Sequence, residues 1–474
     1  MSANLVEQFL AHAEARPGQA ALVDGKGRTT TYAELARMSA ARAAGFRRAG
    51  IGAGDVVLVA RGVSAELYAV LLALFRLGAA ALFPEPAAGF AGLATAVEAA
   101  RPKAMVAGGL GRALRLVSPA LRRLPLLPGA DDAGPGDGPL ERVGDDAPAL
   151  ITFTSGSTGR PKGIVRSAGF LQLQHALLED IRATRPDHVD LISLPVFILS
   201  NLAAGATSVL PAGNLRRPAR LDGARLRAQI AAHRIARVVA PPAVCARLID
   251  GAAGRLPLEA VFTGGGPVFP NLLKGLRAAA PGAAIHAVYG STEAEPIASI
   301  TVDEIADADW RAMAQGAGLL AGRPIPQATV EIRGDEIQVS GPHVNRGYLD
   351  PADDASTKQI RDGVLWHRTG DAGRRDADGR LWLLGRLEAA AGGLFPFAVE
   401  TAALSWPGVR QAALLAGGSP ALLFVAGDRL DEAALNRCAR ALGGIECRAV
   451  QQIPLDRRHN SKTDYAALRR LARR

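Results

Sequence analysis

The feature that most constrains the fold is a repeated alternation of short apolar segments with amphipathic helical segments. Residues 56–60 and 79–83 are short, apolar and β-prone, and residues 64–77 between them have the length and apolar spacing of a helix. The same order returns later, with residues 170–183 helical and residues 191–195 extended. Such alternation predicts parallel strands joined by crossover helices, so the expected fold class is α/β with parallel-rich sheets and flanking helices.

Helix starts can be predicted at both ends of the chain. Residues 4–16 are predicted to form an amphipathic helix, and Thr31 with Glu34 fits a capping box that begins another. Near the C-terminus, Tyr465, Leu468 and Leu471 give a terminal helix its apolar face. Ser461 or Thr463 is expected to cap that helix, which places Lys462 on an exposed loop at its start.

The net charge of +10 suggests a nucleic-acid ligand, but the pattern argues against one. Arginines are scattered through the predicted helices, and aromatic residues make up only 5% of the chain. A basic surface also suits an enzyme with polyanionic substrates, and an arginine-rich composition without binding meaning is the simplest explanation. We therefore expect no nucleic-acid partner.

Three features bear on location. Cys245, Cys438 and Cys447 form neither a close pair nor a metal-ligand spacing, which favours a reduced, cytoplasmic setting. The N-terminus has no basic region before an apolar run, so no signal peptide is expected. The longest apolar run, residues 68–83, is interrupted by Arg76 and Gly78, so no membrane span is expected.

The first candidate site is a loop of small and hydroxylated residues after a β-prone segment. Small residues let a backbone approach a ligand, and successive N–H groups and hydroxyls can surround phosphate oxygens. It is not a Walker A loop, because Lys162 is followed by Gly163 and not by Ser or Thr. A flexible, solvated turn is the alternative. The predicted phosphate-binding residues are Thr154, Ser155, Gly156, Ser157, Thr158, Gly159 and Lys162.

Two further motifs stand at the ends of predicted strands, where open α/β sheets place ligands. Gly264, Gly265 and Gly266 end the strand at 260–263, and a tight turn is the alternative. The strand at 284–288 ends in Tyr289, Gly290, Ser291, Thr292 and Glu293. Tyr289 can stack on a base, Thr292 can donate to a phosphate, and Glu293 can help to hold Mg²⁺; an ordinary loop with a packed tyrosine is the alternative.

The last candidates lie in the final quarter of the chain. Asp371 follows Thr369 and Gly370 in a glycine-rich bend, where a carboxylate suits the two hydroxyls of a ribose, or forms only a local turn. Arg386 and Glu388 follow a predicted strand, and Lys462 precedes the terminal helix.

In this order, the motifs resemble those of the adenylate-forming superfamily, which includes acyl-CoA synthetases, peptide-synthetase adenylation domains and luciferases. The resemblance covers residues 151–474. It implies ATP and Mg²⁺ as cofactors and a small-molecule carboxylic acid as substrate, which is activated as acyl-AMP with release of pyrophosphate. It also implies a large N-terminal domain, residues 1–385, and a small, mobile α+β domain, residues 386–474, with Glu388 as the hinge.

The resemblance further assigns roles to the candidate residues. The phosphate loop and Lys162 would hold the β- and γ-phosphates, and Thr292 and Glu293 the α-phosphate and the metal. Tyr289 and the glycine turn would flank adenine, Asp371 would bind ribose, and Arg386 would reach nucleotide oxygens. Lys462, Thr292 and Glu293 would be the catalytic residues, and Lys462 would bridge the carboxylate and the α-phosphate.

Within the superfamily, several stretches are similar to the β-lactone synthetases of bacterial olefin biosynthesis, namely residues 194–211, 314–324, 366–371 and 458–462 and the altered loop after Glu388. Residues 194–200 lack the histidine that gates the acid pocket of many acyl-CoA synthetases, and residues 389–396 lack the family's usual lysine and Gly-x-Arg-Ile run. In acyl-CoA synthetases that loop contributes to the thiol tunnel. Two second steps stay open: attack by a thiol of coenzyme A or a carrier protein, or closure of a 3-hydroxy acid onto its own hydroxyl. A non-catalytic nucleotide-binding scaffold is the alternative of another class.

Overall fold

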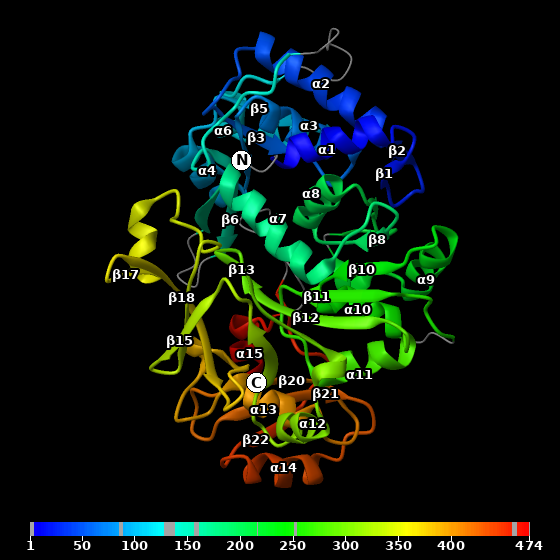
Figure 1. The fold of residues 1–474 in the computed structure, drawn as a ribbon. Coiled ribbons are helices and arrows are strands. Elements are labelled where there is room, and N and C mark those ends of the chain that lie inside the picture. The colour runs from blue at the N-terminus through cyan, green and yellow to red at the C-terminus, as the bar shows by residue number, and fades with distance from the viewer. Residues whose placement is uncertain are drawn as a thin grey trace. The chain divides into compact units, whose positions relative to one another are not determined.

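The computed structural model divides the chain into two compact units. The first contains residues 1–212 and 345–358, and the second residues 213–344 and 359–474. Figure 1 shows the course of the chain through its helices and strands. The structure describes residues 4–84, 89–127, 138–155, 161–215, 217–250, 254–456 and 462–473.

A five-stranded sheet in the first unit carries the predicted phosphate-binding segment. Its order is β5-β3-β4-β6-β7. The pairs among β5, β3, β4 and β6 are parallel, and β6 and β7 form an antiparallel hairpin. The strands are β3 (Val56–Ala60), β4 (Ala80–Phe83), β5 (Ala104–Ala107), β6 (Pro148–Ser155) and β7 (Pro161–Ser167).

The first unit also contains a second group of strands, in the order β8-β9-β1-β2. These are β1 (Ala20–Val23), β2 (Thr29–Thr31), β8 (Val189–Ile192) and β9 (Thr207–Val209). The α-helices of this unit are α1 (Leu5–Ala15), α2 (Tyr32–Arg48), α3 (Ala65–Arg76), α4 (Gly89–Ala100), α5 (Gly109–Val117), α6 (Pro119–Arg122), α7 (Ala168–Arg182) and α8 (Pro195–Ala204), and the short 3₁₀ helix η5 spans Pro351–Ser356.

In the second unit, one long sheet has the order β15-β16-β18-β19-β14-β13-β12-β11-β10. The neighbours β10, β11 and β12 are parallel to one another, and the other neighbouring pairs in this order are antiparallel. The strands are β10 (Arg237–Ala240), β11 (Ala260–Gly264), β12 (Ala284–Ser291), β13 (Ala294–Thr301), β14 (Leu319–Pro324), β15 (Thr329–Arg333), β16 (Glu336–Ser340), β18 (Val364–Arg375) and β19 (Leu381–Arg386); β17 (Lys358–Arg361) pairs with β18 off this path.

The helices of the second unit are distributed according to whether the strands are parallel or antiparallel. Helices separate the parallel strands and become sparse where the strands are antiparallel, as a chain with short connections requires. The helices are η3 (Pro218–Arg220), α9 (Gly223–Ala232), α10 (Pro242–Ile249), α11 (Pro270–Ala279), η4 (Val302–Glu304), α12 (Asp307–Ala314), η6 (Leu387–Ala389), α13 (Pro396–Ala403), α14 (Glu432–Ala441) and α15 (Tyr465–Ala472).

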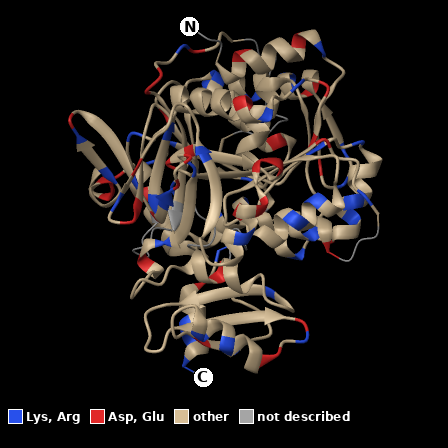
Figure 2. Cartoon of the chain, turned by 60° about the horizontal axis from the view of Figure 1, so that its bottom comes forward, with Lys and Arg blue, Asp and Glu red and all other residues tan. Residues whose placement is uncertain are grey.

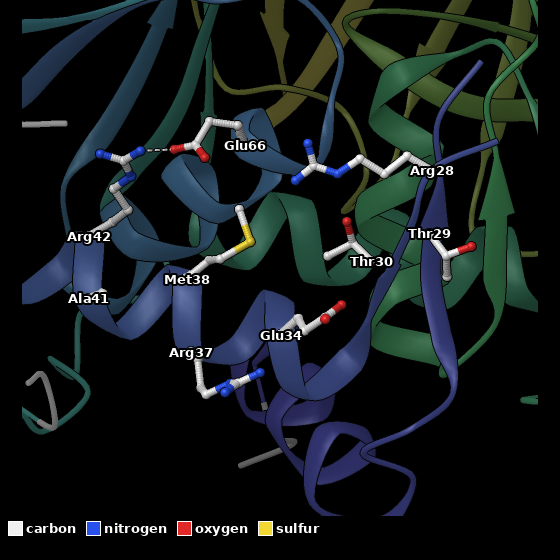
Figure 3. Close-up of a pocket in the computed structure, with 9 residues that line it drawn as sticks. All are labelled: Arg28, Thr29, Thr30, Glu34, Arg37, Met38, Ala41, Arg42 and Glu66. Carbon is white, nitrogen blue, oxygen red and sulfur yellow. Dashed lines mark hydrogen bonds and ion pairs between the residues drawn. The ribbon is translucent and has the colours of Figure 1, made fainter. Parts of the chain in front are cut away.

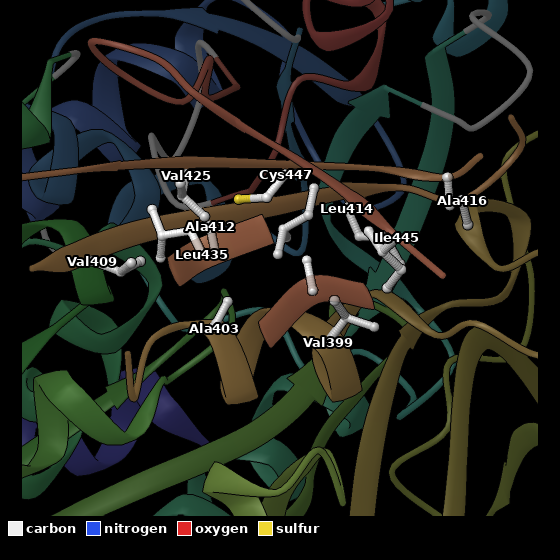
Figure 4. Close-up of a cluster of buried hydrophobic side chains, with 13 residues drawn as sticks. Val399, Ala403, Val409, Ala412, Leu414, Ala416, Val425, Leu435, Ile445 and Cys447 are labelled. Atoms are coloured by element: carbon white, nitrogen blue, oxygen red, sulfur yellow. The ribbon is translucent and has the colours of Figure 1, made fainter. Parts of the chain in front are cut away.

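Residues after 390 build an α+β layer with its own apolar core. The strands β20 (Val409–Leu415), β21 (Leu422–Gly427) and β22 (Glu446–Ala449) form a three-stranded sheet. Leu414, Leu423, Val425 and Ile445 are fully buried in one core cluster beside α13 and α14 (Figure 4). A second cluster includes Leu468 of α15, as its apolar spacing predicted.

The α/β prediction is confirmed, and local signals located several elements. Asn4 caps α1 with its side chain, and Thr31 and Glu34 form the expected capping box at α2. One cap prediction was wrong. The side chain that caps α15 is Asp464, which accepts from the Ala467 N–H at 2.9 Å. Thr463 instead pairs as an extended residue, and Ser461 lies outside the described residues.

The distribution of charge matches the scattered pattern of the sequence. Figure 2 shows lysines and arginines on helices, strands and loops throughout, interspersed with aspartates and glutamates. Many are paired locally, such as Lys103 with Asp55 at 2.8 Å. Within the part of the chain that the structure describes, no helix is long and apolar enough to cross a membrane.

Candidate functional site

The predicted phosphate loop joins the two strands of the β6–β7 hairpin. Thr154 and Ser155 end β6, and they pair with Lys162 and Pro161 of β7 in antiparallel register. This pairing fixes Lys162 on a strand, at the edge of the loop and not within it. The remaining predicted loop residues, Gly156, Ser157, Thr158 and Gly159, lie outside the described residues.

Lys162 is buried, with 7% of its surface exposed. Its Nζ donates to the Ser356 hydroxyl at 2.8 Å and lies 5.4 Å from the centre of the Tyr348 ring. Both partners belong to the first unit, although they follow Lys162 by nearly 200 residues. No local pattern in the sequence indicates either contact.

The glycine turn at the end of β11 is required by a close backbone approach. A Cβ on Gly264 would lie 2.4 Å from the carbonyl oxygen of Val288 on β12, which is too close for any side chain. Gly265 has φ of +74°, in the left-handed region that favours glycine. The neighbouring strands β11 and β12 are parallel, so the turn after Gly264 lies beside the end of β12 that carries Tyr289. The structure therefore brings these two predicted motifs together.

Thr292 and Glu293 form the two-residue turn between β12 and β13. Ser291 pairs with Ala294 across this turn, which places Thr292 and Glu293 at its tip. Both residues are half-buried. Gly290 precedes them, and a Cβ there would lie 3.1 Å from the Ala294 carbonyl oxygen.

Tyr289, Asp371 and Arg386 form one hydrogen-bonded cluster, which we call the carboxylate cluster. The Tyr289 hydroxyl donates to Asp371 Oδ2 at 2.9 Å, and Arg386 donates to Asp371 Oδ1 at 3.0 Å. Burial, and then the neighbouring Asp371 carboxylate, raise the pKa of Tyr289 well above its ordinary value. The phenol therefore stays protonated and remains a donor. A carboxylate accepts more than two hydrogen bonds, so Asp371 retains capacity for ligand hydroxyls.

Glu336 supports the turn that carries Asp371 and was not predicted from the sequence. This buried glutamate on β16 accepts from Arg368 Nε at 2.8 Å and from the Gly370 N–H at 3.1 Å. The Thr369 hydroxyl donates to the Ile337 carbonyl oxygen and accepts from the Asp371 N–H. The strand pairing of β16 with β18 supplies these partners, and no short motif marks them.

Lys462 is exposed, and its backbone is fixed by Asp456. The Lys462 N–H donates to Asp456 Oδ1 at 2.9 Å, and the Asp456 N–H donates to the Lys462 carbonyl oxygen at 2.8 Å. Glu388, the predicted hinge, is exposed in η6.

The unusual loop after Glu388 contains a tight turn. Ala391 and Leu394 exchange two backbone hydrogen bonds, at 3.2 and 2.9 Å. Gly392 and Gly393 between them have φ of +59° and +78°. Two central residues with positive φ match the type I′ hairpin turn, in which glycine is favoured at both positions. Ala391 and Leu394 pack against the core of the α+β layer.

The residues present fit a Mg²⁺ ion only if a bound ligand supplies part of its coordination. In the described part of the chain, no group of three or more His, Cys, Asp or Glu side chains is arranged to hold a metal. Mg²⁺ commonly binds through one or two carboxylates together with phosphate oxygens and water. A single carboxylate at the hairpin tip, Glu293, matches that donor set when a polyphosphate supplies the other ligands.

The first unit also contains a cleft of about 450 Å³. It is lined by both charge types, and Arg42 pairs with Glu66 at one end (Figure 3). None of the predicted site residues lines it. Its lining consists of Arg28, Thr29, Thr30, Glu34, Arg37, Met38, Ala41, Arg42 and Glu66.

The fold and the order of these motifs define an adenylate-forming enzyme. The sequence pattern of the AMP-binding enzyme family matches residues 9–349, and the chain belongs to that family. An olefin β-lactone synthetase of Xanthomonas campestris pv. campestris is 31% identical over 441 residues, which cover 83% of this chain and 79% of that protein. An olefin β-lactone synthetase of Stenotrophomonas maltophilia is 30% identical over 494 residues, which cover 92% and 89%.

Solved structures show the same fold. The crystal structure of IdnL7 superposes with a TM-score of 0.83 and 25% sequence identity, covering 100% of this chain and 99% of that one. The predicted membership of the adenylate-forming superfamily is confirmed. The enzyme uses ATP to activate a carboxylic acid as acyl-AMP, as the sequence predicted.

Proposed function

We propose that this enzyme is a β-lactone synthetase, which closes the acyl-AMP of a 3-hydroxy fatty acid onto its own hydroxyl. The observation that carries the proposal is the likeness to two olefin β-lactone synthetases over most of the chain. An intramolecular closure needs no external acceptor, so neither coenzyme A nor a carrier protein enters the reaction.

The turn at Gly392 and Gly393 supports this choice. In acyl-CoA synthetases the corresponding loop contributes to the thiol tunnel. Here the segment closes on itself through the two backbone bonds between Ala391 and Leu394. Both flanking side chains pack into the α+β core, and no lysine is present between residues 389 and 396. These features favour a reaction in which no long thiol has to be guided past this loop.

In the first step, a carboxylate oxygen of the acid attacks the α-phosphorus of ATP, and pyrophosphate leaves. Catalysis of such a transfer depends on positioning and on neutralising charge. In our proposal Lys162 holds the β- and γ-phosphates, and Thr292 contacts the α-phosphate. Lys462 stabilises the negative charge that gathers between the carboxylate and the α-phosphate, which makes it a catalytic residue together with Thr292 and Glu293.

The nucleoside is held by residues of the second unit. Asp371 accepts hydrogen bonds from the ribose hydroxyls, and Arg386 reaches nucleotide oxygens from the same cluster. Tyr289 and the turn at Gly264, Gly265 and Gly266 flank the adenine. Glu293 would hold Mg²⁺, which when bound neutralises charge on the phosphates.

In the second step, the oxygen of the 3-hydroxyl attacks the acyl carbon of acyl-AMP. The bond from the acyl carbon to the phosphate oxygen breaks, AMP leaves, and the hydroxyl proton passes to solvent or a base. The product is one water lighter than the 3-hydroxy acid. We further propose that residues 386–474 form a small mobile domain hinged at Glu388, and that the enzyme works in the cytoplasm, where its three free cysteines stay reduced.

Product analysis by mass spectrometry tests the proposal. The enzyme is given ATP, Mg²⁺ and a panel of acids with and without a 3-hydroxyl, each in the presence and absence of coenzyme A. We expect AMP and a product one water lighter than the 3-hydroxy acid, without coenzyme A. An acyl-thioester that forms only with coenzyme A would contradict the lactone step and leave the adenylation step intact. A matched control uses the 3-deoxy acid, which should be adenylated but not cyclised.

A further inference from the structure

Residues 345–358, which we call the strap, lie along the strand that carries Lys162. The strap belongs to the first unit, although 132 residues of the second unit, 213–344, precede it in the chain. Its Leu349 N–H donates to the Gly163 carbonyl oxygen at 2.7 Å, and Tyr348 pairs with Ile164 in antiparallel register. Asn345 donates from its side chain to the Val165 carbonyl oxygen. The strap therefore extends the edge of the β6–β7 hairpin.

Two strap residues define where the Lys162 ammonium lies. Ser356 accepts its hydrogen bond at 2.8 Å, and the Tyr348 ring lies beneath it at 5.4 Å, within the range of a cation–π contact. Tyr348 lies opposite Ile164, and Lys162 is two residues before Ile164 on the same strand. Tyr348 and Lys162 are therefore diagonal neighbours, a separation that long side chains can bridge. Tyr348 is itself buried, so its ring is fixed.

Ser356 is oriented by its own hydrogen bond. Its hydroxyl donates to the Asp353 carbonyl oxygen at 3.2 Å, which leaves the oxygen lone pairs for Lys162. The short helix η5 that ends at Ser356 is capped by Asp350, which accepts from the Ala352 N–H. Asp354 accepts from the Tyr348 N–H at 3.0 Å. Contacts within the strap thus hold both residues that touch Lys162.

The partners of Lys162 are neutral. In the described part of the chain, no carboxylate forms an ion pair with Lys162. A hydroxyl takes one of the three ammonium donors and a ring faces its charge, so two donors and the full positive charge remain for phosphate oxygens. Because the lysine side chain is already ordered before ATP binds, less of the binding free energy is lost to ordering it.

We propose that Ser356 and Tyr348 are positioning residues that hold Lys162 ready for the polyphosphate of ATP. The inference rests on the proposed contact of Lys162 with the β- and γ-phosphates. It adds that a distant segment, which carries none of the nucleotide motifs, sets the affinity for those phosphates.

The test compares ATP·Mg²⁺ with AMP as ligands of the full-length enzyme, measured by calorimetry without any acid. AMP has no β- or γ-phosphate, so a residue that acts through Lys162 should not change its binding. We expect Ser356→Ala to weaken ATP about five- to tenfold and to leave AMP unchanged, as the loss of one net hydrogen bond predicts. Ser356→Thr keeps the hydroxyl and should restore ATP binding. Tyr348→Leu should weaken ATP, and Tyr348→Phe, which keeps the ring, should not.

A double-mutant cycle separates this inference from the proposed function. In a Lys162→Ala background, Ser356→Ala should have no further effect on ATP binding. Equal losses in both backgrounds, or wild-type ATP binding by Ser356→Ala while Lys162→Ala is impaired, would overturn the positioning role alone. If Lys162→Ala itself binds ATP normally, the phosphate contact fails, and the positioning role fails with it. An equal loss of ATP and AMP binding in Ser356→Ala would show a merely structural role.

Discussion

The strap and the carboxylate cluster each hold one charged side chain, but they do so in opposite ways. Lys162 is buried between a hydroxyl and an aromatic ring, and its charge is not compensated by an ion pair there. Asp371 is held by Arg386 and by the Tyr289 hydroxyl, so each of its oxygens already accepts a hydrogen bond. One arrangement preserves a charge, and the other neutralises it.

The difference matches the ligand groups that each region is proposed to bind. A polyphosphate is strongly anionic, so an uncompensated ammonium gains the most from meeting it. Ribose hydroxyls are neutral, so a carboxylate needs only orientation and free lone pairs, and a paired carboxylate costs less to keep partly buried. The comparison predicts that mutations in the two regions change nucleotide affinity differently. The affinities for ATP and AMP, measured side by side, show the difference.

The largest effect is expected outside both regions, at Lys462. Lys462→Ala should lower the rate of adenylation by about 100-fold or more, because it removes a charge that stabilises the transition state. Binding of ATP and AMP should change little. The measurement is pyrophosphate exchange alongside nucleotide binding by calorimetry. Near-normal exchange would refute the catalytic role, and a large loss of ATP affinity would place Lys462 with the binding residues. Lys462→Arg, which keeps the charge but changes its geometry, is the matched control.

Asp371→Ala should give the largest loss of nucleotide affinity. It removes the acceptor for the ribose hydroxyls and leaves Arg386 without its carboxylate, at a cost of about 2–3 kcal/mol, or roughly 30- to 150-fold. ATP and AMP should weaken equally, because both contain the ribose. Asp371→Asn keeps one acceptor oxygen and should lose less. An unchanged KM for ATP would contradict the ribose assignment, and a loss restricted to ATP would contradict the contrast between the two regions.

Lys162→Ala should weaken ATP by about 10- to 30-fold and leave AMP unchanged, whereas Asp371→Ala should weaken both nucleotides. The loss corresponds to about 1.4–2 kcal/mol, in the range of a charge-assisted contact. Titration of both nucleotides checks it, and raising the salt concentration should reduce the difference from wild type, since an ion contact is screened. If AMP weakens as much as ATP, Lys162 supports the fold of the hairpin and not the phosphates.

The sequence predicted the residue types of both regions better than their contacts. Tyr289, Asp371 and Arg386 were each proposed from short motifs, yet nothing local indicated that their side chains bond to one another, because their meeting depends on β12, β18 and β19 lying in one sheet. Ser356, Tyr348 and Glu336 were missed for the same reason. Their roles come from strand pairing between distant segments, and a hydroxyl or a buried glutamate carries no sequence signal of it.

Where the determinants are local, the predictions largely succeeded. The capping box of Thr31 and Glu34 acts within three residues of the start of α2 and was predicted correctly. The helix predicted from residue 4 begins at Leu5, and Asn4 is its cap. The cap of α15 failed because three polar residues, Ser461, Thr463 and Asp464, stand together, and any of them could cap. The pairing of Thr463 with Leu455 delays the helix by one residue, which makes Asp464 the cap.

The smallest effect is expected for Tyr289→Phe, which tests the internal order of the carboxylate cluster. The substitution keeps the ring that is proposed to flank adenine and removes only the hydroxyl that donates to Asp371 Oδ2. Because burial and Asp371 raise the pKa of this phenol well above its ordinary value, the hydroxyl is a donor at every pH at which the enzyme would be assayed. Its loss should therefore have the same effect from pH 6 to pH 9.

We expect Tyr289→Phe to weaken ATP and AMP equally, by about threefold, the worth of one net hydrogen bond that orients the carboxylate. Tyr289→Leu, which also removes the ring, should lose more, and the difference between the two variants measures the stacking contribution. Tighter binding by Tyr289→Phe would contradict the orienting role. It would show that the phenol competes with the ribose for Oδ2, so that this region, unlike the strap, has to release a partner before it can bind.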